Sequence, residues 1–374
     1  MNPVLLLGIS ILLAAAPCQA GTLVMLVGSR LLVARDNGAA KVVPFLRSPS
    51  GVGTPAINDP AHILWLDRGP QSRAMDPDRL QVFDLGTGRI SQQPLPHRRV
   101  RQNRILRLLR MLPQRRGLAY RWMDRYKSSL FTFIGKTRTI PRTFRNLRST
   151  VSSVQVMPNG RFIVVTQPGF NRKSERRRRV KPFLRYLRGL PQRLFFGNAW
   201  GGPLHMRLER PSFEWIRLVD QGRRAVYLLP AGARAHERSY ELRSFDFTTN
   251  QETVMGKITV PSLRGHYAPP VLHTSIAGPW VVRFEGMHYT LYEAGKRGSR
   301  KLALPEGERL VEPLDCLVGQ HTSLTPYWIT IRWLGKVGPR RFRYAVHVIR
   351  IEDAKTVFST THVGISPARA SYLP

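Results

Sequence analysis

Short runs of apolar residues that end at a glycine recur along the chain. Six such runs end at Gly28, Gly69, Gly169, Gly222, Gly286 and Gly335. Their length and their content of β-branched and aromatic residues are typical of buried β-strands. Four runs carry a tryptophan at a similar place, as expected if a large residue filled an equivalent slot between neighbouring sheets: Trp65, Trp215, Trp280 and Trp328.

A second pattern follows most of these runs, namely an alternating strand, a turn rich in Asp, Gly, Asn or Thr, and another strand. Five copies open their turns at Asp36, Asp84, Asp246, Glu293 and Glu352. The intervals between these turns are 48, 162, 47 and 59 residues. An outer hairpin at the shorter spacing is typical of four-stranded propeller blades. We expect the acidic residues to serve turn geometry, because Asp and Asn tolerate the local backbone.

Two phrases carry a resemblance to a known superfamily. The Asn-Gly turn and strand of residues 158–163 (PNGRFI) and the phrase DLGTG at residues 84–88 resemble the blades of WD-repeat and TolB-type β-propellers. This resemblance implies a ring of blades around a channel, a fold used more often for binding than for one chemistry. We therefore predict an all-β fold, a β-propeller of about six four-stranded blades, with five to seven possible, as a single domain over residues 21–374.

The N-terminus has the features of a secretory signal. No charged side chain occurs from residue 1 to 29, and Val4–Ala16 is a compact apolar run. Small residues at Cys18 and Ala20 fit cleavage after Ala20. Because a basic segment before the apolar run is missing, an uncleaved anchor and a buried N-terminal segment are the alternatives. We predict a signal peptide at residues 1–20 and an exported protein, periplasmic or secreted. Cleavage would leave Cys316 without a disulfide partner.

Arginine dominates the charge of the chain. The 59 Lys and Arg residues oppose 23 Asp and Glu residues, for a net charge of +36, and only 10 of the 59 are lysines. Because guanidinium groups pair with phosphates and carboxylates, this excess indicates an anionic partner. Two segments hold 25 of the 36 excess charges: residues 97–150 carry a net +15 and residues 170–210 a net +10.

The two basic segments also repeat each other. Residues 106–115 and 184–193 are identical at eight of ten positions. Each copy has the spacing of an amphipathic helix, with leucines on one face and arginines on the other. Pro113 and Pro191 are expected to end these helices. We predict two basic amphipathic helical insertions, at about 97–150 and 170–210, side by side on one rim of the propeller.

We expect the arginines of these insertions to bind an anionic partner. A membrane surface is favoured, because basic amphipathic helices bind anionic lipid through apolar insertion and phosphate contact. Two alternatives remain: the apolar faces dock on the propeller and leave the arginines solvated, or the interleaved aromatic residues around Trp122 stack on nucleic acid. Protein partners also remain open. The predicted anion-binding residues are Arg107, Arg110, Arg115, Arg176, Arg177, Arg178, Arg179, Arg185, Arg188 and Arg193.

Linear catalytic motifs are absent from the sequence. Residues 133–137 match the end of a P-loop motif, but the motif requires a glycine at the position occupied by Leu130. The Gly-x-Ser-x-Gly, Gly-x-Gly-x-x-Gly, His-Glu-x-x-His and Cys-x-x-Cys motifs do not occur. We expect no cofactor and no metal ion. Two loose histidine groups are the remaining candidates for a metal, His62 with Asp59 and Asp67, and His266 with His273 and His288.

These observations favour an exported, non-catalytic propeller that acts as a binding scaffold at an anionic membrane surface or another polyanion. One alternative is a nucleic-acid-binding propeller, which requires that residues 1–20 are not a secretory signal. Another is a propeller hydrolase or lyase that acts on an anionic polymer. Such an enzyme would draw its site from loops around the channel, so missing linear motifs do not exclude it.

Overall fold

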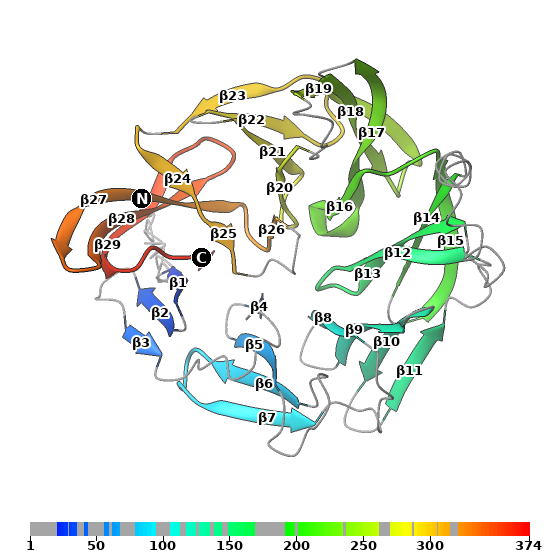
Figure 1. Ribbon diagram of the computed structural model, residues 1–374. Helices are drawn as coiled ribbons and strands as arrows, with labels where there is room; N and C mark the ends of the chain where they lie inside the picture. The colour runs from blue at the N-terminus through cyan, green and yellow to red at the C-terminus, as the bar shows by residue number, and fades with distance from the viewer. Residues whose placement is uncertain are drawn as a thin grey trace, which may run out of the picture.

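The computed structural model describes residues 21–28, 30–35, 41–43, 56–59, 62–67, 79–94, 105–112, 117–124, 127–134, 138–143, 149–168, 191–198, 201–234, 237–261, 270–285, 288–304, 306–314 and 321–374. In these ranges the chain forms seven β-sheets arranged as a ring, the architecture of a β-propeller (Figure 1). The blade number lies inside the predicted range and is one more than the central estimate of six.

The first four blades follow the chain from residue 22 to residue 210. Blade 1 contains β30 (Arg369–Leu373), β1 (Thr22–Val27), β2 (Arg30–Arg35) and β3 (Lys41–Val43), with β25 (Glu312–Pro313) paired to β30. Blade 2 contains β4 (Ala56–Asp59), β5 (His62–Asp67), β6 (Arg79–Asp84) and β7 (Ile90–Pro94). Blade 3 contains β8 (Ile105–Leu112), β9 (Gly117–Asp124), β10 (Lys127–Ile134) and β11 (Arg138–Thr143). Blade 4 contains β12 (Ser149–Val156), β13 (Arg161–Pro168), β14 (Gln192–Asn198) and β15 (Gly201–Arg210).

The remaining blades complete the ring. Blade 5 contains β16 (Trp215–Val219), β17 (Arg224–Arg234), β18 (Glu237–Asp246) and β19 (Gln251–Pro261), with the 3-10 turn η3 (Asp220–Gly222) after β16. Blade 6 contains β20 (Leu272–Ser275), β21 (Trp280–Glu285), β22 (His288–Glu293) and β23 (Arg300–Ala303), with β26 (Thr322–Ser323) paired to β20. Blade 7 contains β24 (Glu308–Leu310), β27 (Tyr327–Gly338), β28 (Arg341–Arg350) and β29 (Thr356–Gly364).

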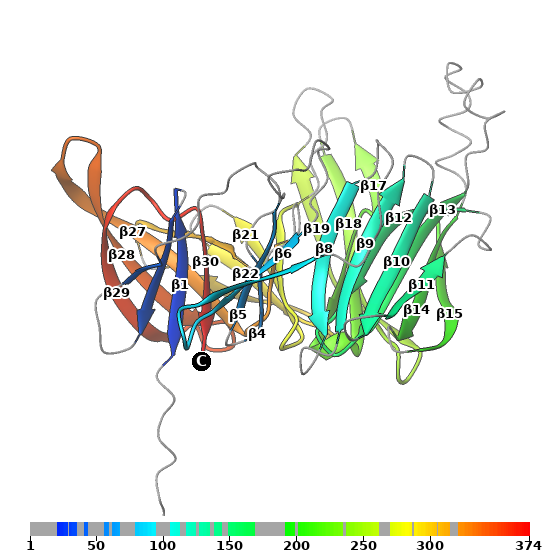
Figure 2. The same cartoon turned by 90° about the horizontal axis from the view of Figure 1, so that it is seen from below.

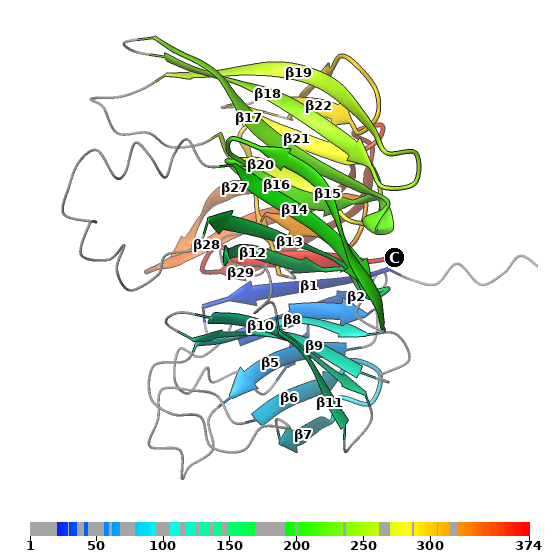
Figure 3. The same ribbon diagram turned by 90° about the vertical axis from the view of Figure 1, so that its right-hand side faces the viewer.

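The ring is closed by strands from the two ends of the chain. β30 pairs antiparallel with β1, so that Leu373 lies opposite Thr22 and Arg369 opposite Leu26. Blade 1 therefore combines the first and last strands of the chain in one sheet, and a backbone hydrogen bond from Ala368 to Leu26 adds to the closure. The closure of the ring therefore rests on the antiparallel pairing of β30 with β1 in this sheet (Figure 3).

The hydrophobic core lies between neighbouring blades. Its buried clusters join blades 4 and 5, blades 5 and 6, blades 6 and 7, blades 7 and 1, and blades 1 and 2. A strand in the middle of a blade is thus covered on both faces, so its sequence need not alternate between apolar and polar residues. This explains why the glycine-terminated runs are almost continuously apolar.

The predicted hairpins are confirmed. All five acidic-turn copies join the third and fourth strands of a blade, in blades 1, 2, 5, 6 and 7. The interval of 162 residues between the second and third copies spans blades 3 and 4. The predicted Asn-Gly turn links β12 to β13, with Gly160 at a φ of 86°.

The prediction of one equivalent tryptophan slot holds at the level of the strand for three of the four residues. Trp65, Trp280 and Trp328 lie on the second strands of blades 2, 6 and 7, whereas Trp215 starts the first strand of blade 5. Trp328 is buried and packs against Tyr289 with ring centroids 5.0 Å apart, whereas Trp215 and Trp280 are half-buried.

The predicted helical insertions are wrong wherever the structure describes them. Residues 105–112 form strand β8, and the segment 97–150 supplies the whole of blade 3. Of the second segment, β14 and β15 complete blade 4, while residues 170–190 lie outside the described residues. The 3-10 turn η3 is the only helical element in the described ranges. These ranges therefore contain no helix long and apolar enough to cross a membrane.

A β-bulge explains the misleading helical spacing of the first segment. Leu108 lies opposite Tyr120 and Arg110 lies opposite Ala119, so Leu109 is an extra residue in β8. An extra residue shifts the alternation of side chains by one position. Such a shift replaces the two-residue spacing of a regular strand with a three-residue spacing, which is also found in helices.

Candidate anion-binding site

Three of the ten predicted arginines lie in described strands, Arg107 and Arg110 in β8 and Arg193 in β14. The pairing of β8 with β9 brings the backbone of Arg107 opposite that of Arg121. On the exposed surface of blade 4, Arg193 Nε lies 2.6 Å from Glu209 Oε2. The other predicted residues, Arg115, Arg176 to Arg179, Arg185 and Arg188, lie outside the described residues.

The two basic segments occupy neighbouring places in the ring. Strand β12 of blade 4 contacts both β8 and β10 of blade 3. Figure 2 shows these blades next to each other at one end of the molecule. We call residues 97–150 and 170–210 the basic sector. The two segments carry a net charge of +25, and their described strands belong to two adjacent blades.

A second cationic group lies on the inner strands around the axis of the ring. This axial cluster consists of Arg217 on β16, His273 on β20, Glu312 on β25, His321 next to β26 and Arg369 on β30. Two parallel strand pairs bring it together, because β26 pairs with β20 and β25 pairs with β30. The rings of the two histidines have their centroids 4.7 Å apart. Arg369 Nε lies 3.2 Å and His321 Nδ1 3.9 Å from the Glu312 carboxylate.

Both histidines of the axial cluster favour the neutral form. Burial lowers the pKa of His273 to about 3, and the charge of His321 acts in the same direction. Burial also lowers the pKa of His321; Glu312 opposes this shift, and the charges of Arg217 and Arg369 add to it. At neutral pH the cluster therefore presents two guanidinium groups against one carboxylate.

The guanidinium groups have hydrogen-bonding capacity for an anion. Arg369 Nη1 is buried and has no hydrogen-bond partner within the described structure. Arg217 is nine-tenths buried, and its Nη1 donates to the carbonyl oxygen of Ile216 at 2.6 Å. Buried guanidinium donors at the junction of several strands suit a carboxylate or phosphate group. The chemistry available here is the binding of an anionic group.

The structure pairs histidines differently from the two predicted groups. His62 Nε2 lies 3.4 Å from Asp84 Oδ2. His273 packs against His321, which comes from another segment, and His266 lies outside the described residues. No group of three or more His, Cys, Asp or Glu side chains in the described part of the chain could hold a metal ion.

Asp84 and Asp246 serve turn geometry, as expected, whereas Asp36 lies outside the described residues. Asp84 Oδ1 accepts hydrogen bonds from the amides of Gly86 and Thr87, both at 2.9 Å. Asp246 repeats this device, with Oδ1 accepting from the amides of Thr248 at 2.8 Å and Thr249 at 3.3 Å. These are local contacts within one turn.

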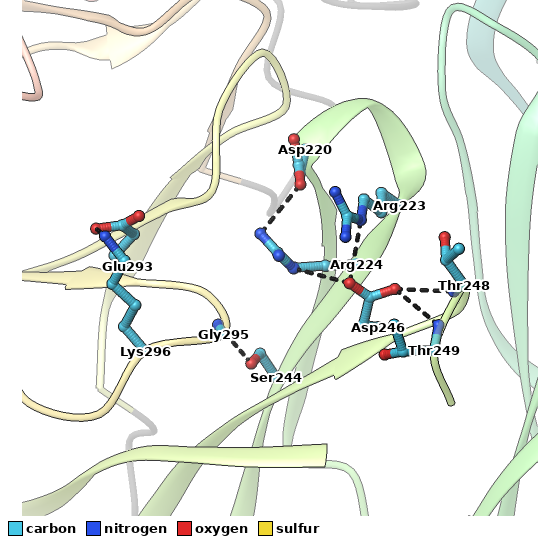
Figure 4. A network of polar contacts seen from close by, with 10 residues as sticks. All are labelled: Asp220, Arg223, Arg224, Ser244, Asp246, Thr248, Thr249, Glu293, Gly295 and Lys296. Atoms are coloured by element: carbon cyan, nitrogen blue, oxygen red, sulfur yellow. Dashed lines mark hydrogen bonds and ion pairs between the residues drawn. The ribbon is translucent and has the colours of Figure 1, made fainter. Parts of the chain in front are cut away.

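Asp246 is also the centre of a larger polar network (Figure 4). Its Oδ2 lies 3.1 Å from Arg223 Nε and 3.3 Å from Arg224 Nε. Burial alone would raise the pKa of Asp246, but the amides of Thr248 and Thr249 and the two arginine charges outweigh it, so the pKa lies below its ordinary 3.8. The carboxylate form therefore stabilises the folded state.

Asp246→Asn is expected to lower the free energy of unfolding by about 1–3 kcal/mol at neutral pH, because two charge-assisted hydrogen bonds are lost. The folded-state pKa lies below the unfolded value, so this stabilisation is complete above pH 3.8 and is lost as the pH falls further. Urea unfolding of both proteins at several pH values measures the difference.

The matched control for this substitution is Asp353→Asn. Asp353 also accepts a turn amide hydrogen bond, from Lys355 at 3.2 Å, but is exposed and lies 3.6 Å from Arg350. Its expected cost is within about 0.5 kcal/mol. A difference between wild type and Asp246→Asn that stays constant from neutral pH into strong acid would contradict the assignment.

Sequence reasoning missed most of the axial cluster. Arg217, Glu312, His321 and Arg369 come from strands far apart in the sequence, so no linear spacing connects them. One signal was available: Arg217 interrupts the apolar strand WIRLV, where a charged residue is rarely found without a buried partner or a ligand.

Comparison with known proteins adds information about the fold alone. No protein-family model matches the chain, and no curated protein sequence matches it. Among solved structures, a puromycin-hydrolysing peptidase of Mycobacterium tuberculosis aligns with 90% of this chain and 52% of its own, at 9% identity and a TM-score of 0.50. TolB from Acinetobacter baumannii aligns with 75% of this chain and 65% of its own, at 13% identity and a TM-score of 0.41.

The WD40 domain of SCAP from fission yeast aligns with 91% of this chain and 80% of its own, at 7% identity and a TM-score of 0.40. The chain thus spans about half the length of the peptidase and less than two thirds of TolB. At 9% identity, the likeness to the peptidase concerns the fold alone. Identities this low carry no information about activity or ligand.

Proposed function

We propose that this protein is an exported, non-catalytic β-propeller that binds an anionic membrane surface. The observation that carries the proposal is the basic sector, whose two segments hold 25 of the 36 excess charges and whose described strands form two adjacent blades. Each Lys or Arg near an anionic bilayer contributes about 1 kcal/mol, and these contributions act together only where the cations share one side of the molecule.

The strand structure of blade 3 changes how this contact would work. Two amphipathic helices would have inserted leucines into the bilayer, whereas the strands of blade 3 are part of a sheet. The contact of the basic sector is therefore electrostatic and should weaken steeply with salt. Nucleic acid also presents negatively charged phosphates. Binding to vesicles and to single-stranded DNA distinguishes the two kinds of partner.

The axial cluster favours binding over catalysis. Burial favours the neutral form of both histidines, and the charges of Arg217 and Arg369 add to this effect at His321. General acid–base catalysis at neutral pH works best with a group whose pKa lies near that pH. His273, with a pKa of about 3, does not meet this condition. Arg217 and Arg369 instead suit an anionic ligand at the axis, which agrees with the charge preference of the basic sector.

The quadruple variant Arg107→Ala, Arg110→Ala, Arg185→Ala and Arg188→Ala is expected to bind anionic vesicles at least about tenfold more weakly than wild type at low salt, because four cations are removed from one sector. Co-sedimentation of the protein beginning at residue 21 with phosphatidylglycerol and phosphatidylcholine vesicles, across a salt series, measures this change.

The control removes the same charge from blades 5 and 6, at Lys257, Arg297, Arg300 and Lys301, which are all exposed. It should bind within about twofold of wild type if location matters as well as net charge. Equal binding of all three proteins to anionic vesicles would overturn the role of the basic sector. Binding to single-stranded DNA without binding to lipid would overturn the membrane as partner.

A further inference from the structure

The hairpin of β27 and β28 extends beyond the body of blade 7. Strand β24 pairs with β27 only as far as Arg332. Residues 332–343, the end of β27, the turn and the start of β28, contain no buried residue. Figure 2 shows this hairpin projecting past the neighbouring strands on one rim of the ring. We call residues 332–343 the rim hairpin.

Large apolar side chains are exposed on the rim hairpin. Trp333 is 61%, Leu334 47% and Val337 51% exposed. Val363 and Ile365, next to the hairpin on and after β29, are exposed as well. Half of the large exposed hydrophobic residues in the described ranges therefore gather at this one extension. Clustered exposure of this kind marks an interaction surface, whereas single exposed residues need no explanation.

Two β-bulges set the direction of the apolar residues. Trp333 pairs with Tyr344 and Gly335 with Arg343, which leaves Leu334 as an extra residue. Lys336 pairs with Phe342 and Gly338 with Arg341, which leaves Val337 as a second extra residue. Bulges re-aim side chains and interrupt the pairing of an edge. In the rim hairpin, the two extra residues are both aliphatic, Leu334 and Val337.

The strand register divides the hairpin into two faces. Residues directly opposite each other share a face of the sheet. One face therefore carries the aromatic residues Trp333, Phe342 and Tyr344, of which the last two have ring centroids 6.4 Å apart, together with Lys336 opposite Phe342. The other face carries Arg341 and Arg343. The hairpin is thus amphipathic, with aromatic rings and guanidinium groups on opposite sides.

The turn at the tip holds a cation in an unfavourable backbone conformation. Pro339 and Arg340 connect β27 to β28, and Arg340 has a φ of 58°. A type II turn places proline first and a residue with positive φ second, where glycine or asparagine is the usual choice. A residue with a side chain is sterically disfavoured at positive φ. Arginine therefore occupies a turn position where the backbone conformation favours glycine or asparagine.

The rim hairpin is entirely cationic. It contains Arg332, Lys336, Arg340, Arg341 and Arg343, and no acidic residue occurs from residue 316 to residue 351. None of the five cations forms an ion pair with a carboxylate in the part of the chain that the structure describes. Their charge is available to a partner outside the molecule.

We propose that the rim hairpin is an interfacial anchor that inserts into the headgroup region of an anionic phospholipid bilayer. Tryptophan and tyrosine favour the boundary between water and acyl chains. Arginine and lysine bind phosphate there while their stems lie along apolar surface. Leu334 and Val337 argue against nucleic acid, because aliphatic side chains gain little from stacked bases. The inference rests on the proposed membrane function but uses a blade outside the basic sector.

The experiment compares the vesicle binding of two variants. Trp333→Ser with Leu334→Ser and Val337→Ser should bind phosphatidylglycerol vesicles at least about tenfold more weakly than wild type, since three apolar side chains leave the interface. Ile90→Ser with Val254→Ser and Val271→Ser removes exposed apolar residues from blades 2, 5 and 6 and should bind within about twofold of wild type. Urea unfolding establishes that both variants are folded.

Arg340→Gly separates binding from folding. The substitution relieves the positive φ and should leave stability unchanged or raised, while it lowers affinity for anionic vesicles about fivefold. Quenching by lipids brominated on the acyl chain gives a direct readout. Wild type should be quenched more than Trp333→Phe, because Trp333 is the residue placed at the bilayer.

The outcomes distinguish this inference from the function on which it rests. Wild-type affinity in the triple hairpin variant, or equal bromolipid quenching of wild type and Trp333→Phe, would overturn the anchor. If the quadruple arginine variant alone loses binding, the basic sector stands and the anchor falls. If the hairpin variant alone loses binding, the anchor stands and the role of the basic sector falls. A wild-type protein that ignores anionic vesicles would overturn both.

Discussion

Tyr372→Ala is expected to lower the free energy of unfolding by about 3–5 kcal/mol, because it removes a buried aromatic ring from the closing sheet. Tyr372 lies on β30, with its ring centroid 5.2 Å from that of Tyr327 and 5.8 Å from that of Phe358. It therefore joins the last strand of the chain to blade 7. A loss of this size is a large part of the stability of an ordinary domain.

The closing sheet should also open more readily in this variant. Limited proteolysis is expected to cleave the C-terminal residues of Tyr372→Ala faster than those of wild type, because local opening becomes less costly. Tyr372→Phe keeps the ring and should cost no more than about 1.5 kcal/mol. A cost below about 1 kcal/mol for Tyr372→Ala in urea unfolding would contradict closure of the ring through β30.

The second large effect is expected at Glu308, where Glu308→Ala should cost about 3–5 kcal/mol. The Glu308 side chain is 1% exposed and lies on β24, the first strand of blade 7. Its Oε2 accepts a hydrogen bond from Thr330 Oγ1, and its Oε1 lies 2.5 Å from His347 Nδ1. Removing the carboxylate leaves the buried Thr330 hydroxyl and the partly buried His347 ring without their partner, which costs more than the pairing itself contributes.

The control replaces the whole polar group with apolar side chains. Glu308→Leu with Thr330→Val and His347→Leu should recover most of the lost stability, since buried polar clusters can be exchanged for apolar ones of similar volume. Thermal and urea unfolding of the single and triple variants measure this recovery. A triple variant as unstable as Glu308→Ala would contradict the assignment of the cost to unpaired polar groups.

The local features of the fold could be predicted from the sequence. Asp84 and Asp246 stand in turns whose hydrogen bonds involve amides two and three residues away. Such turns are determined by neighbouring residues, so their sequence signature is reliable. Blades 1, 2, 5, 6 and 7 were recognisable for this reason.

Blade 3 could not be recognised in this way, because its determinants are not local. The bulge at Leu109 depends on the pairing of β8 with β9, and the apolar residues of β8 reflect its place within a blade of the ring. A short apolar run with irregular spacing does not distinguish a strand from a helix. The prediction of two helices followed from that ambiguity.

The two candidate sites differ in the same way: the basic sector could be predicted from the sequence, and most of the axial cluster could not. The basic sector is visible as a charge surplus, because net charge is a property of composition. The axial cluster depends on β25 and β26, strands of two residues whose parallel partners lie 57 and 48 positions away at Glu312↔Arg369 and Thr274↔Thr322. Pairings this long in range have no sequence signature in a single chain. Only the arrangement of blades brings His273 to His321.

The most direct test of membrane binding is hydrogen exchange of the protein on phosphatidylglycerol vesicles, compared with phosphatidylcholine vesicles. We expect added protection within residues 105–143, 192–210 and 332–343, and unchanged exchange in the outer strands of blades 5 and 6. The same exchange pattern on both kinds of vesicle, or protection confined to blades 5 and 6, would contradict an anionic membrane as the partner.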